Sequence, residues 1–173
     1  ISEYTIPESV TTIGDEAFFS CNSLTSVNIP DSVTTIGGFA FSHCYRLTSV
    51  TIPDSVTTIG DGAFNNCYNG LKSVIISENL TSIGGFAFSQ CISLKSVTIP
   101  DSVTSIGVYA FSNCTDLTSV YCKATTPPAL GNSGVFNNNG SGRKIYVPTE
   151  SVETYKSATN WSEYADAIVG YNF

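Results

Sequence analysis

Leu24-Thr-Ser-Val-Asn-Ile-Pro-Asp-Ser-Val-Thr-Thr-Ile-Gly-Gly-Phe-Ala-Phe-Ser-His-Cys44 recurs almost unchanged in the units that start at Leu47, Leu71 and Leu94. Cysteines mark the period, since Cys21, Cys44, Cys67, Cys91 and Cys114 follow one another at intervals of 23, 23, 24 and 23 residues. A fixed period of this length is typical of a solenoid, in which each repeat forms one coil and shares its core with its neighbours.

The pattern Leu-x-x-Val-x-Ile within each unit predicts a short strand whose alternate residues face the core. Pro30-Asp31 then turns the chain, and Val33 and Ile36 return to the core. The segment from Gly37 to Cys44 is expected to be tight or 3₁₀-like. We therefore expect 23-residue coils, each with one short strand in a parallel sheet and short strand or 3₁₀ segments on the convex side.

The composition excludes several classes of protein. Seven basic and fourteen acidic residues give a net charge of −7, which argues against a nucleic-acid binder. No apolar run approaches 18 residues, so no transmembrane helix and no membrane insertion are expected. The chain opens in the middle of a coil, with Ile1 in the leucine position, and we expect further sequence to precede it.

The repeat degrades towards the C-terminus. Residues 1–148 are expected to form the array, with an irregular last coil over 123–148 and a long, loose connection over 125–142. Residues 149–173 are expected to form a small cap with a short helix from Ser151, the N-cap candidate, to Ala158. In the last coil, the residues that keep positions of the repeat are Val135, Phe136, Asn139, Ile145 and Val147. In the cap, the apolar residues that could cover this coil are Trp161, Tyr164, Ile168 and Val169.

The motif Ile-Pro-Asp-Ser-Val-Thr-x-Ile-Gly-x-x-Ala-Phe-x-x-Cys-x-x-Leu, present from Ile29 to Leu47, resembles the BspA-like, or Treponema pallidum-type, leucine-rich repeats of bacterial surface proteins. The resemblance extends from Ile1 to about Pro148 and implies a leucine-rich-repeat solenoid. It also implies a secreted or cell-surface bacterial protein that binds host or microbial macromolecules. Such repeats serve many partners, so the resemblance does not identify one.

The six cysteines allow three interpretations. No Cys-x-x-Cys pair is present and His43 is the only histidine, which argues against a metal site. Neighbouring coils lie roughly 5 Å apart, which leaves a disulfide within the column geometrically possible. Because Asn139 shares this column, we favour buried free thiols that make weak hydrogen bonds, and we assign Cys122 to core packing.

An acidic column and His43 are the remaining candidates for chemistry. The column could bind calcium, but we favour hydrated carboxylates that each cap their own turn; it contains Glu8, Asp31, Asp54, Glu78 and Asp101. His43 occupies a position that other coils fill with Ser, Asn or Gln, which is typical of a solvated loop. No nucleophile or acid/base motif appears, so we expect no enzymatic activity and no cofactor.

The outward strand positions are mostly Ser and Thr in the N-terminal half, whereas cations and tyrosines gather in the C-terminal half. The candidate partner-binding residues are Lys72, Lys95, Tyr121, Arg143, Lys144 and Tyr146. Aromatic rings beside cationic side chains suit acidic protein segments or acidic glycans, because arginine and tyrosine commonly dominate the binding energy of such contacts. Two further candidate patches are Phe39, Phe86 and Tyr109 on the convex side, and Tyr45, Tyr68 and Ile92 after the cysteines.

The sequence thus predicts a non-catalytic, adhesin-like module whose partner is a protein or a glycan. Two alternatives remain open at this stage. The chain could be a carbohydrate-binding accessory module, because tyrosines flank polar strands, or a passive spacer of a larger surface protein.

Overall fold

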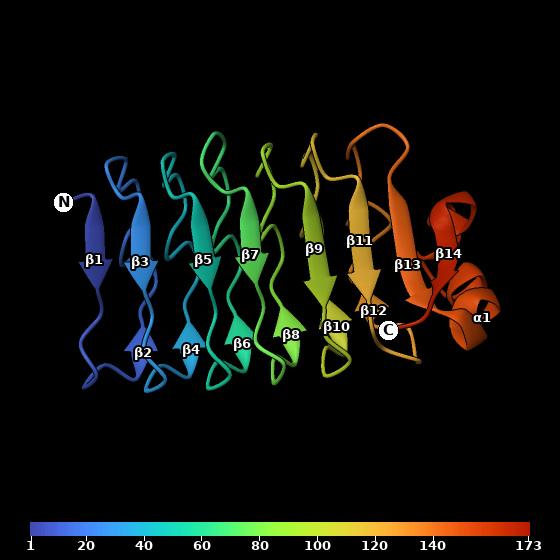
Figure 1. Cartoon of the computed structure of the whole chain (residues 1–173), viewed down its shortest axis with the longest axis horizontal. Helices are drawn as coiled ribbons and strands as arrows, with labels where there is room; N and C mark the ends of the chain where they lie inside the picture. The colour runs from blue at the N-terminus through green and yellow to red at the C-terminus, as the bar shows by residue number, and fades with distance from the viewer.

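The Leu-x-x-Val-x-Ile segments form short parallel strands along one face of an elongated solenoid (Figure 1). The computed structural model describes all residues from Ile1 to Phe173. Side chains alternate as expected, so that Val97 and Ile99 are buried while Ser96 and Thr98 are exposed. These strands are β1 (Glu3–Thr5), β3 (Ser26–Asn28), β5 (Ser49–Thr51), β7 (Ser73–Ile75), β9 (Ser96–Ile99), β11 (Ser119–Cys122), β13 (Lys144–Pro148) and β14 (Ile168–Tyr171).

Hydrogen bonding divides this strand face into three parallel sheets instead of the single sheet that was expected. The sheets are β1-β3, β5-β7 and β9-β11-β13-β14. Strands of three residues form few hydrogen bonds with their neighbours. Two neighbouring strands can therefore lose their pairing while a hydrogen bond next to them persists. Thr48 N still donates to Thr25 O at 3.1 Å across the first break.

The return path of each coil forms a second sheet on the opposite face. Its six two-residue strands pair in parallel from one end to the other, and each contributes one buried side chain, Ile or Leu, to the core. They are β2 (Thr12–Ile13), β4 (Thr35–Ile36), β6 (Thr58–Ile59), β8 (Ser82–Ile83), β10 (Ser105–Ile106) and β12 (Ala129–Leu130). Because β12 lies within residues 125–142, that connection is more ordered than the sequence predicted.

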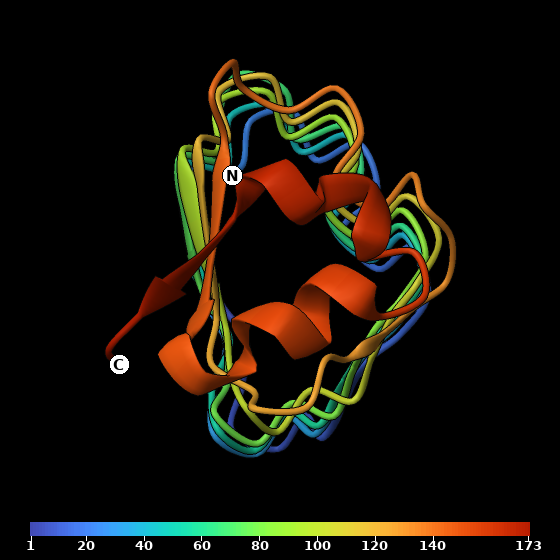
Figure 2. The same cartoon turned by 90° about the vertical axis from the view of Figure 1, so that its right-hand side faces the viewer.

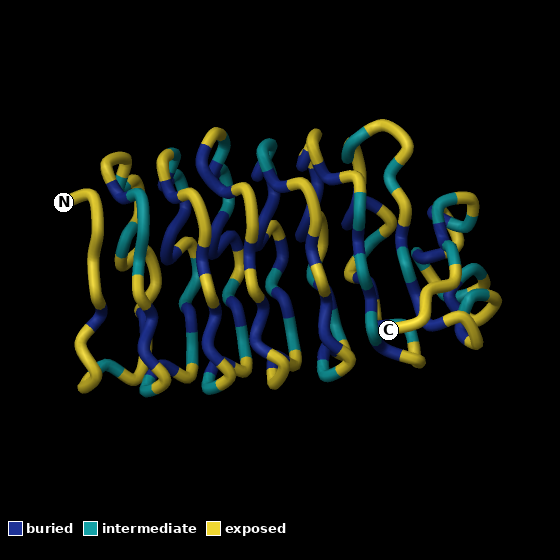
Figure 3. The backbone as a smooth tube through the Cα atoms, viewed as in Figure 1, coloured by how far each residue is buried: buried dark blue, intermediate teal, exposed yellow.

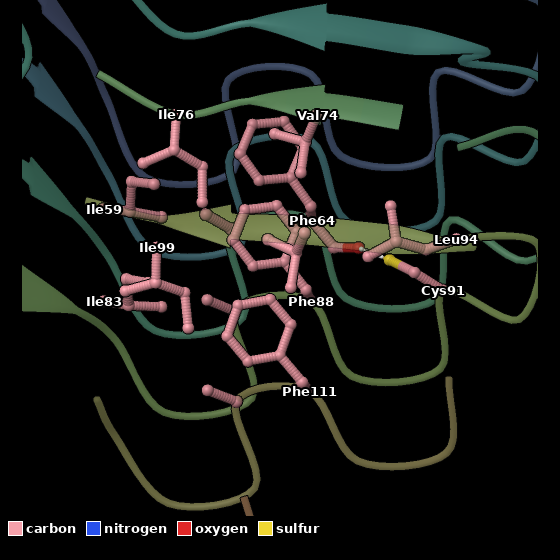
Figure 4. Packing of buried hydrophobic residues seen from close by; sticks show 14 of the residues in the cluster. Ile59, Phe64, Val74, Ile76, Ile83, Phe88, Cys91, Leu94, Ile99 and Phe111 are labelled. Carbon is pink, nitrogen blue, oxygen red and sulfur yellow. Dashed lines mark hydrogen bonds between the residues drawn. The ribbon is translucent and has the colours of Figure 1, made fainter. Parts of the chain in front are cut away.

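A stack of phenylalanine rings fills the space between the two faces (Figure 4). Successive rings lie 4.9–5.7 Å apart and within 12° of parallel, and they belong to Phe18, Phe41, Phe64, Phe88, Phe111 and Phe136. Forty-five buried residues form one continuous core around this stack. Buried segments recur from coil to coil along the array (Figure 3). The repeat period therefore stacks identical side chains at the spacing between coils.

The segment between the second sheet and the next strand is a succession of tight turns closed by i to i+3 bonds, such as Ser42 N to Phe39 O at 3.0 Å. Two positions per coil have left-handed backbone. One is the position of His43, where φ is +61°, and the other is that of Phe39, where φ is +54°. Left-handed backbone favours Asn and His among the residues of the His43 column, in addition to the solvation that the sequence indicated.

The C-terminal segment folds across the open end of the last coil (Figure 2). It contains the 3₁₀ helices η1 (Thr149–Ser151) and η2 (Ser162–Ala167) around the helix α1 (Val152–Ser157). Trp161 is buried, its ring lies 5.8 Å from that of Phe136, and its indole N–H donates to Pro128 O at 2.8 Å. One detail differs from expectation, since the Ser151 side chain makes no capping bond. Ile168 and Val169 lie in β14, which pairs with β13 and extends the sheet, and Ile168 is buried against the last coil.

No helix of this fold is long and apolar enough to cross a bilayer.

Candidate binding surface

Tyr121 and Tyr146 are brought together on the strand face by the register of β11 and β13. The two residues pair directly, and their half-buried rings stack with centroids 4.7 Å apart and planes 13° from parallel. Both side chains lie in the outward column that other coils fill with Thr, Asn or Ile. The stack therefore presents a flat aromatic surface where most of the array presents small polar groups.

Two residues that the sequence did not single out complete this surface. Tyr171, in β14, has its ring 5.4 Å from Tyr121 and 5.6 Å from Tyr146, edge-on to both. The ring of Phe173 lies 5.0 Å from that of Tyr171. We call Tyr121, Tyr146, Tyr171 and Phe173 the aromatic cluster. Its last two members could have been found only if the tail had been recognised as one more strand in register.

A shallow hollow of about 280 Å³ lies beside the aromatic cluster. Its lining consists of Thr98, Tyr121, Lys123, Tyr171 and Phe173. The ammonium of Lys123 is 2.9 Å from Oε1 of Glu78. A cation, an aromatic surface and a polar hydroxyl therefore meet in one place, which is an arrangement suited to contacting a partner group.

The predicted cations occupy different surroundings. Lys72, Lys95 and Lys144 are exposed on the strand face, directly before or at the start of β7, β9 and β13. Lys72 and Lys95 lie on neighbouring coils and directly precede β7 and β9, which belong to separate sheets. Lys144 lies on the same strand as Tyr146, two residues before it.

Arg143 differs from these lysines, since its side chain is turned into the C-terminal segment. Its Nη1 donates to the carbonyl of Phe136 and, at 3.2 Å, to Oδ1 of Asn139. The guanidinium carbon lies 4.9 Å from the centre of the Tyr164 ring, and burial lowers the pKa of Arg143. The structure therefore does not place Arg143 with Tyr121 and Tyr146, and its outward position, expected from the strand register, is wrong.

The thiols form a ladder inside the array, and all six cysteines are free. Cys44, Cys67, Cys91, Cys114 and Cys122 are buried, whereas Cys21, in the first coil, is only half-buried, contrary to the expectation for the whole column. Burial raises the pKa of Cys44 and of Cys114 to about 12, and that of Cys122 to about 11. These groups are neutral, inert packing elements at ordinary pH.

The acidic column is exposed, but its carboxylates do not each cap their own turn. Oδ1 of Asp54 accepts a hydrogen bond from the backbone N–H of Glu78, in the next coil, at 3.0 Å. The expectation of self-capping is therefore wrong at Asp54, because the next coil brings an N–H within reach. No three side chains among His, Cys, Asp and Glu are placed to hold a metal ion.

Ser42 and His43 are the nearest approach to a nucleophile and base, with Oγ and Nδ1 2.9 Å apart. The Ser42 side chain is buried, and its hydroxyl donates to the carbonyl of Asn65 at 3.1 Å. Nε2 of His43 faces the Asn66 amide at 3.4 Å. Both side chains are therefore engaged in holding adjacent coils together.

The other two candidate patches are found where the sequence placed them. Phe39, Phe86 and Tyr109 are about 40% exposed, and the rings of Phe86 and Tyr109 stack at 5.3 Å. Tyr45 and Tyr68 stack at 5.8 Å but are half-buried, and the hydroxyl of Tyr68 donates to Gln90. Neither patch combines aromatic rings with a cation and a hollow, as the strand face does.

A family model described as the BspA-type leucine-rich-repeat region matches residues 1–118 and 70–162, in six copies. Among solved structures, a leucine-rich-repeat protein from Bacteroides ovatus is 39% identical over 84% of this chain, with a TM-score of 0.74. The T. pallidum leucine-rich-repeat protein is 34% identical over 69% of the chain, with a TM-score of 0.67. This chain spans 37% and 58% of the lengths of those two proteins.

A leucine-rich cell surface protein from Faecalibacterium prausnitzii matches the whole chain at 23% identity, with a TM-score of 0.53 and 64% of its own length covered. This similarity shows the fold alone. Among curated proteins, none matches the chain.

Proposed function

This chain belongs to the BspA-type leucine-rich-repeat family, and we propose that it is an adhesin-like binding module of a secreted or cell-surface bacterial protein. Proteins of this family are generally non-catalytic and serve as protein-interaction modules. The surface location is part of this proposal: the repeats resemble those of bacterial surface proteins, and a protein of the same fold from F. prausnitzii is described as a cell surface protein. The partner is a host or microbial macromolecule, and we place its contact on the strand face.

The aromatic cluster is the observation that carries this proposal. Stacked Tyr121 and Tyr146, with Tyr171 edge-on, give a rigid aromatic surface that loses little conformational entropy when it is covered. The exposed ammonium groups of Lys72, Lys95 and Lys144 lie on the same face. The chemistry favours an acidic protein segment, whose carboxylates pair with the lysines while its apolar atoms cover the rings.

Two pairs of substitutions test this assignment. Charge reversal by Lys72→Glu with Lys95→Glu is expected to weaken binding and to reduce its dependence on salt. Tyr121→Ala with Tyr146→Ala is expected to weaken binding by a factor of ten or more, which corresponds to roughly 1.4 kcal/mol or above. Phe86→Ala with Tyr109→Ala, on a different face, is the matched control. Binding is measured by biolayer interferometry against immobilised poly-glutamate peptide, heparin fragments and neutral glycans.

The probes separate the candidate functions. Selective binding of the acidic peptide supports the proposal. Preference for neutral glycans that is lost with the tyrosines would instead assign a carbohydrate-binding accessory role. If no probe binds, or if binding survives both pairs of substitutions, the strand face is not the recognition surface and the spacer role is favoured.

A further inference from the structure

A second hollow, distinct from the one beside the aromatic cluster, lies in the N-terminal half of the strand face. It has a volume of about 650 Å³ and is lined by β3, β5, β7 and the turns that follow them. We call it the acidic groove. Its outward strand residues are Ser26, Asn28, Thr51 and Ile75, and its carboxylates are Asp31, Asp54 and Glu78.

The lining of the acidic groove contains three carboxylates and no Lys or Arg. Oδ1 of Asp54 is fixed by the N–H of Glu78, which leaves its second oxygen for another donor. The single cation that pairs with the groove is Lys123, whose ammonium approaches Glu78 to 2.9 Å. One of the three rim carboxylates, Glu78, therefore already accepts an ammonium group in this fold.

Ile75 provides an independent observation. It is 63% exposed, whereas the same outward column contains Thr5, Asn28 and Thr51 in the three preceding coils and Thr98 in the next. An exposed isoleucine on a sheet gains stability when another apolar side chain covers it, by roughly 25 cal/mol per Å² of apolar surface removed from water. The groove thus combines an apolar contact point with a negatively charged rim.

We propose that the acidic groove binds an extended peptide segment in which cationic and apolar residues alternate. Coils repeat at about 4.8 Å, so that three coils extend over roughly 10 Å, or about three residues of extended chain. One apolar side chain then covers Ile75, and the cations one and three residues from it, on the side of β5 and β3, reach Asp54 and Asp31. A second copy of this chain is a poor occupant because each copy has a net charge of −7.

Lys123 would compete with the cationic peptide for Glu78. Removing its charge by Lys123→Gln is therefore expected to strengthen binding about two- to five-fold, the range of an exposed ion pair. A gain of affinity on removal of a lysine distinguishes this arrangement from a surface that merely tolerates a cationic peptide.

The probe is a fluorescein-labelled peptide, Lys-Leu-Lys-Leu-Lys, with blocked ends, and the readout is fluorescence anisotropy. Asp54→Asn, which keeps an acceptor for the Glu78 N–H, and Ile75→Thr are each expected to weaken binding about two- to five-fold. Asp101→Asn is the matched control, because Asp101 belongs to the same column but lines a different hollow. Its effect should stay below a factor of 1.5, a small fraction of an ion-pair contribution.

Several outcomes would overturn the proposal. Equal binding of a Glu-Leu-Glu-Leu-Glu peptide would show that charge does not select the occupant. An equal loss with Asp101→Asn would show only general attraction to an acidic protein. Self-association in sedimentation velocity that Ile75→Thr abolishes would assign the groove to a second copy. The Tyr121→Ala/Tyr146→Ala variant should bind this peptide normally, so failure here and failure of the proposed partner surface are distinguishable.

Discussion

The Sγ atom of Cys91 lies 3.2 Å from the carbonyl oxygen of Phe64 in the preceding coil and donates a hydrogen bond to it. Equivalent bonds of 3.1–3.3 Å join Cys44, Cys67 and Cys114 to the preceding phenylalanine carbonyls. In the last coil, Asn139 takes this role and its amide donates to Phe111 O at 2.7 Å. The cysteine column is therefore a column of donors that links each coil to the one before it.

The first prediction concerns the energy of this link. Cys91→Ala is expected to lower the free energy of unfolding by about 1–3 kcal/mol, because it leaves the carbonyl of Phe64 without a donor. Cys91→Ser, which keeps a donor, should recover part of the loss. Cys21→Ala is the control, since Cys21 is half-buried and its thiol makes no bond of this kind; its effect should be below about 0.5 kcal/mol. Urea unfolding followed by tryptophan fluorescence measures all three.

Thiol reactivity gives a second prediction. Titration of the native protein with an aromatic disulfide reagent at pH 8 should modify Cys21 first, with the five buried thiols reacting only after denaturation. Six thiols per chain are expected in denaturant. A count of four or two there would reveal disulfides and contradict the donor column.

The third prediction is a loss of stability at alkaline pH. Burial raises the pKa of Cys44 and Cys114 from 9.0 to about 12, so the unfolded chain loses these protons at lower pH than the folded chain does. Stability from these thiols is complete below pH 9 and declines between about pH 9 and 12, by about 1.4 kcal/mol per pH unit for each thiol. Urea midpoints from pH 7.5 to 10.5 should fall, and the fall should be shallower in Cys44→Ala with Cys114→Ala. Equal slopes in both proteins would exclude this origin.

Most of the architecture could be predicted from the period of the repeat, because a single register assigns the inward-facing positions of every coil. Val97, Phe88 and Cys91 are buried where the spacing placed them. The left-handed backbone at Phe39, Phe86 and Tyr109 could not be read in this way, since aromatic residues rarely adopt it and carry no sequence signal for it. Gly62 in the same column, and Asn66 and Asn113 in the other, were the only hints.

The candidate site was predicted in part. Tyr121 and Tyr146 follow from the strand register, which is set by the repeat itself. Tyr171 and Phe173 lie in a tail that has lost the repeat motif, and their place depends on β14 pairing with β13. Arg143 has an outward register position, yet hydrogen-bond acceptors on Phe136 and Asn139 draw its long side chain towards the C-terminal segment.

The fourth prediction tests a close approach between coils. Gly62 has a φ of +63°, and a Cβ there would lie 2.4 Å from Cε1 of Phe39. Gly62→Ala is therefore expected to destabilise the protein by about 1–2 kcal/mol from backbone strain alone, with a further loss from the clash. Phe39→Ala in the same chain should relieve the clash but not the strain.

Gly14→Ala is the control for that experiment, because no atom lies within 4 Å of a Cβ at Gly14. Its melting temperature should stay equal or rise slightly, since alanine reduces the entropy of the unfolded chain. If Gly62→Ala were as harmless as Gly14→Ala, the ring of Phe39 would not rest on Gly62 in solution.

The last prediction separates Arg143 from Lys144, its neighbour in the sequence. Arg143 donates two hydrogen bonds and lies over the Tyr164 ring, whereas Lys144 is exposed and its side chain forms no such bonds. Arg143→Gln is expected to cost about 1.5–3 kcal/mol, the range for hydrogen bonds from a charged group. It should also alter the fluorescence of the buried Trp161, whose ring lies 5.8 Å from that of Phe136, the residue whose carbonyl Arg143 holds. Lys144→Gln should change stability by less than about 0.5 kcal/mol.

For binding to an acidic peptide, the order of the two effects should reverse. Lys144→Gln should weaken the binding, whereas the folded Arg143→Gln protein should retain it at low temperature. An Arg143→Gln protein with unchanged melting but lost binding would return Arg143 to the recognition surface, because its contacts with Phe136 and Asn139 would then contribute nothing to the fold.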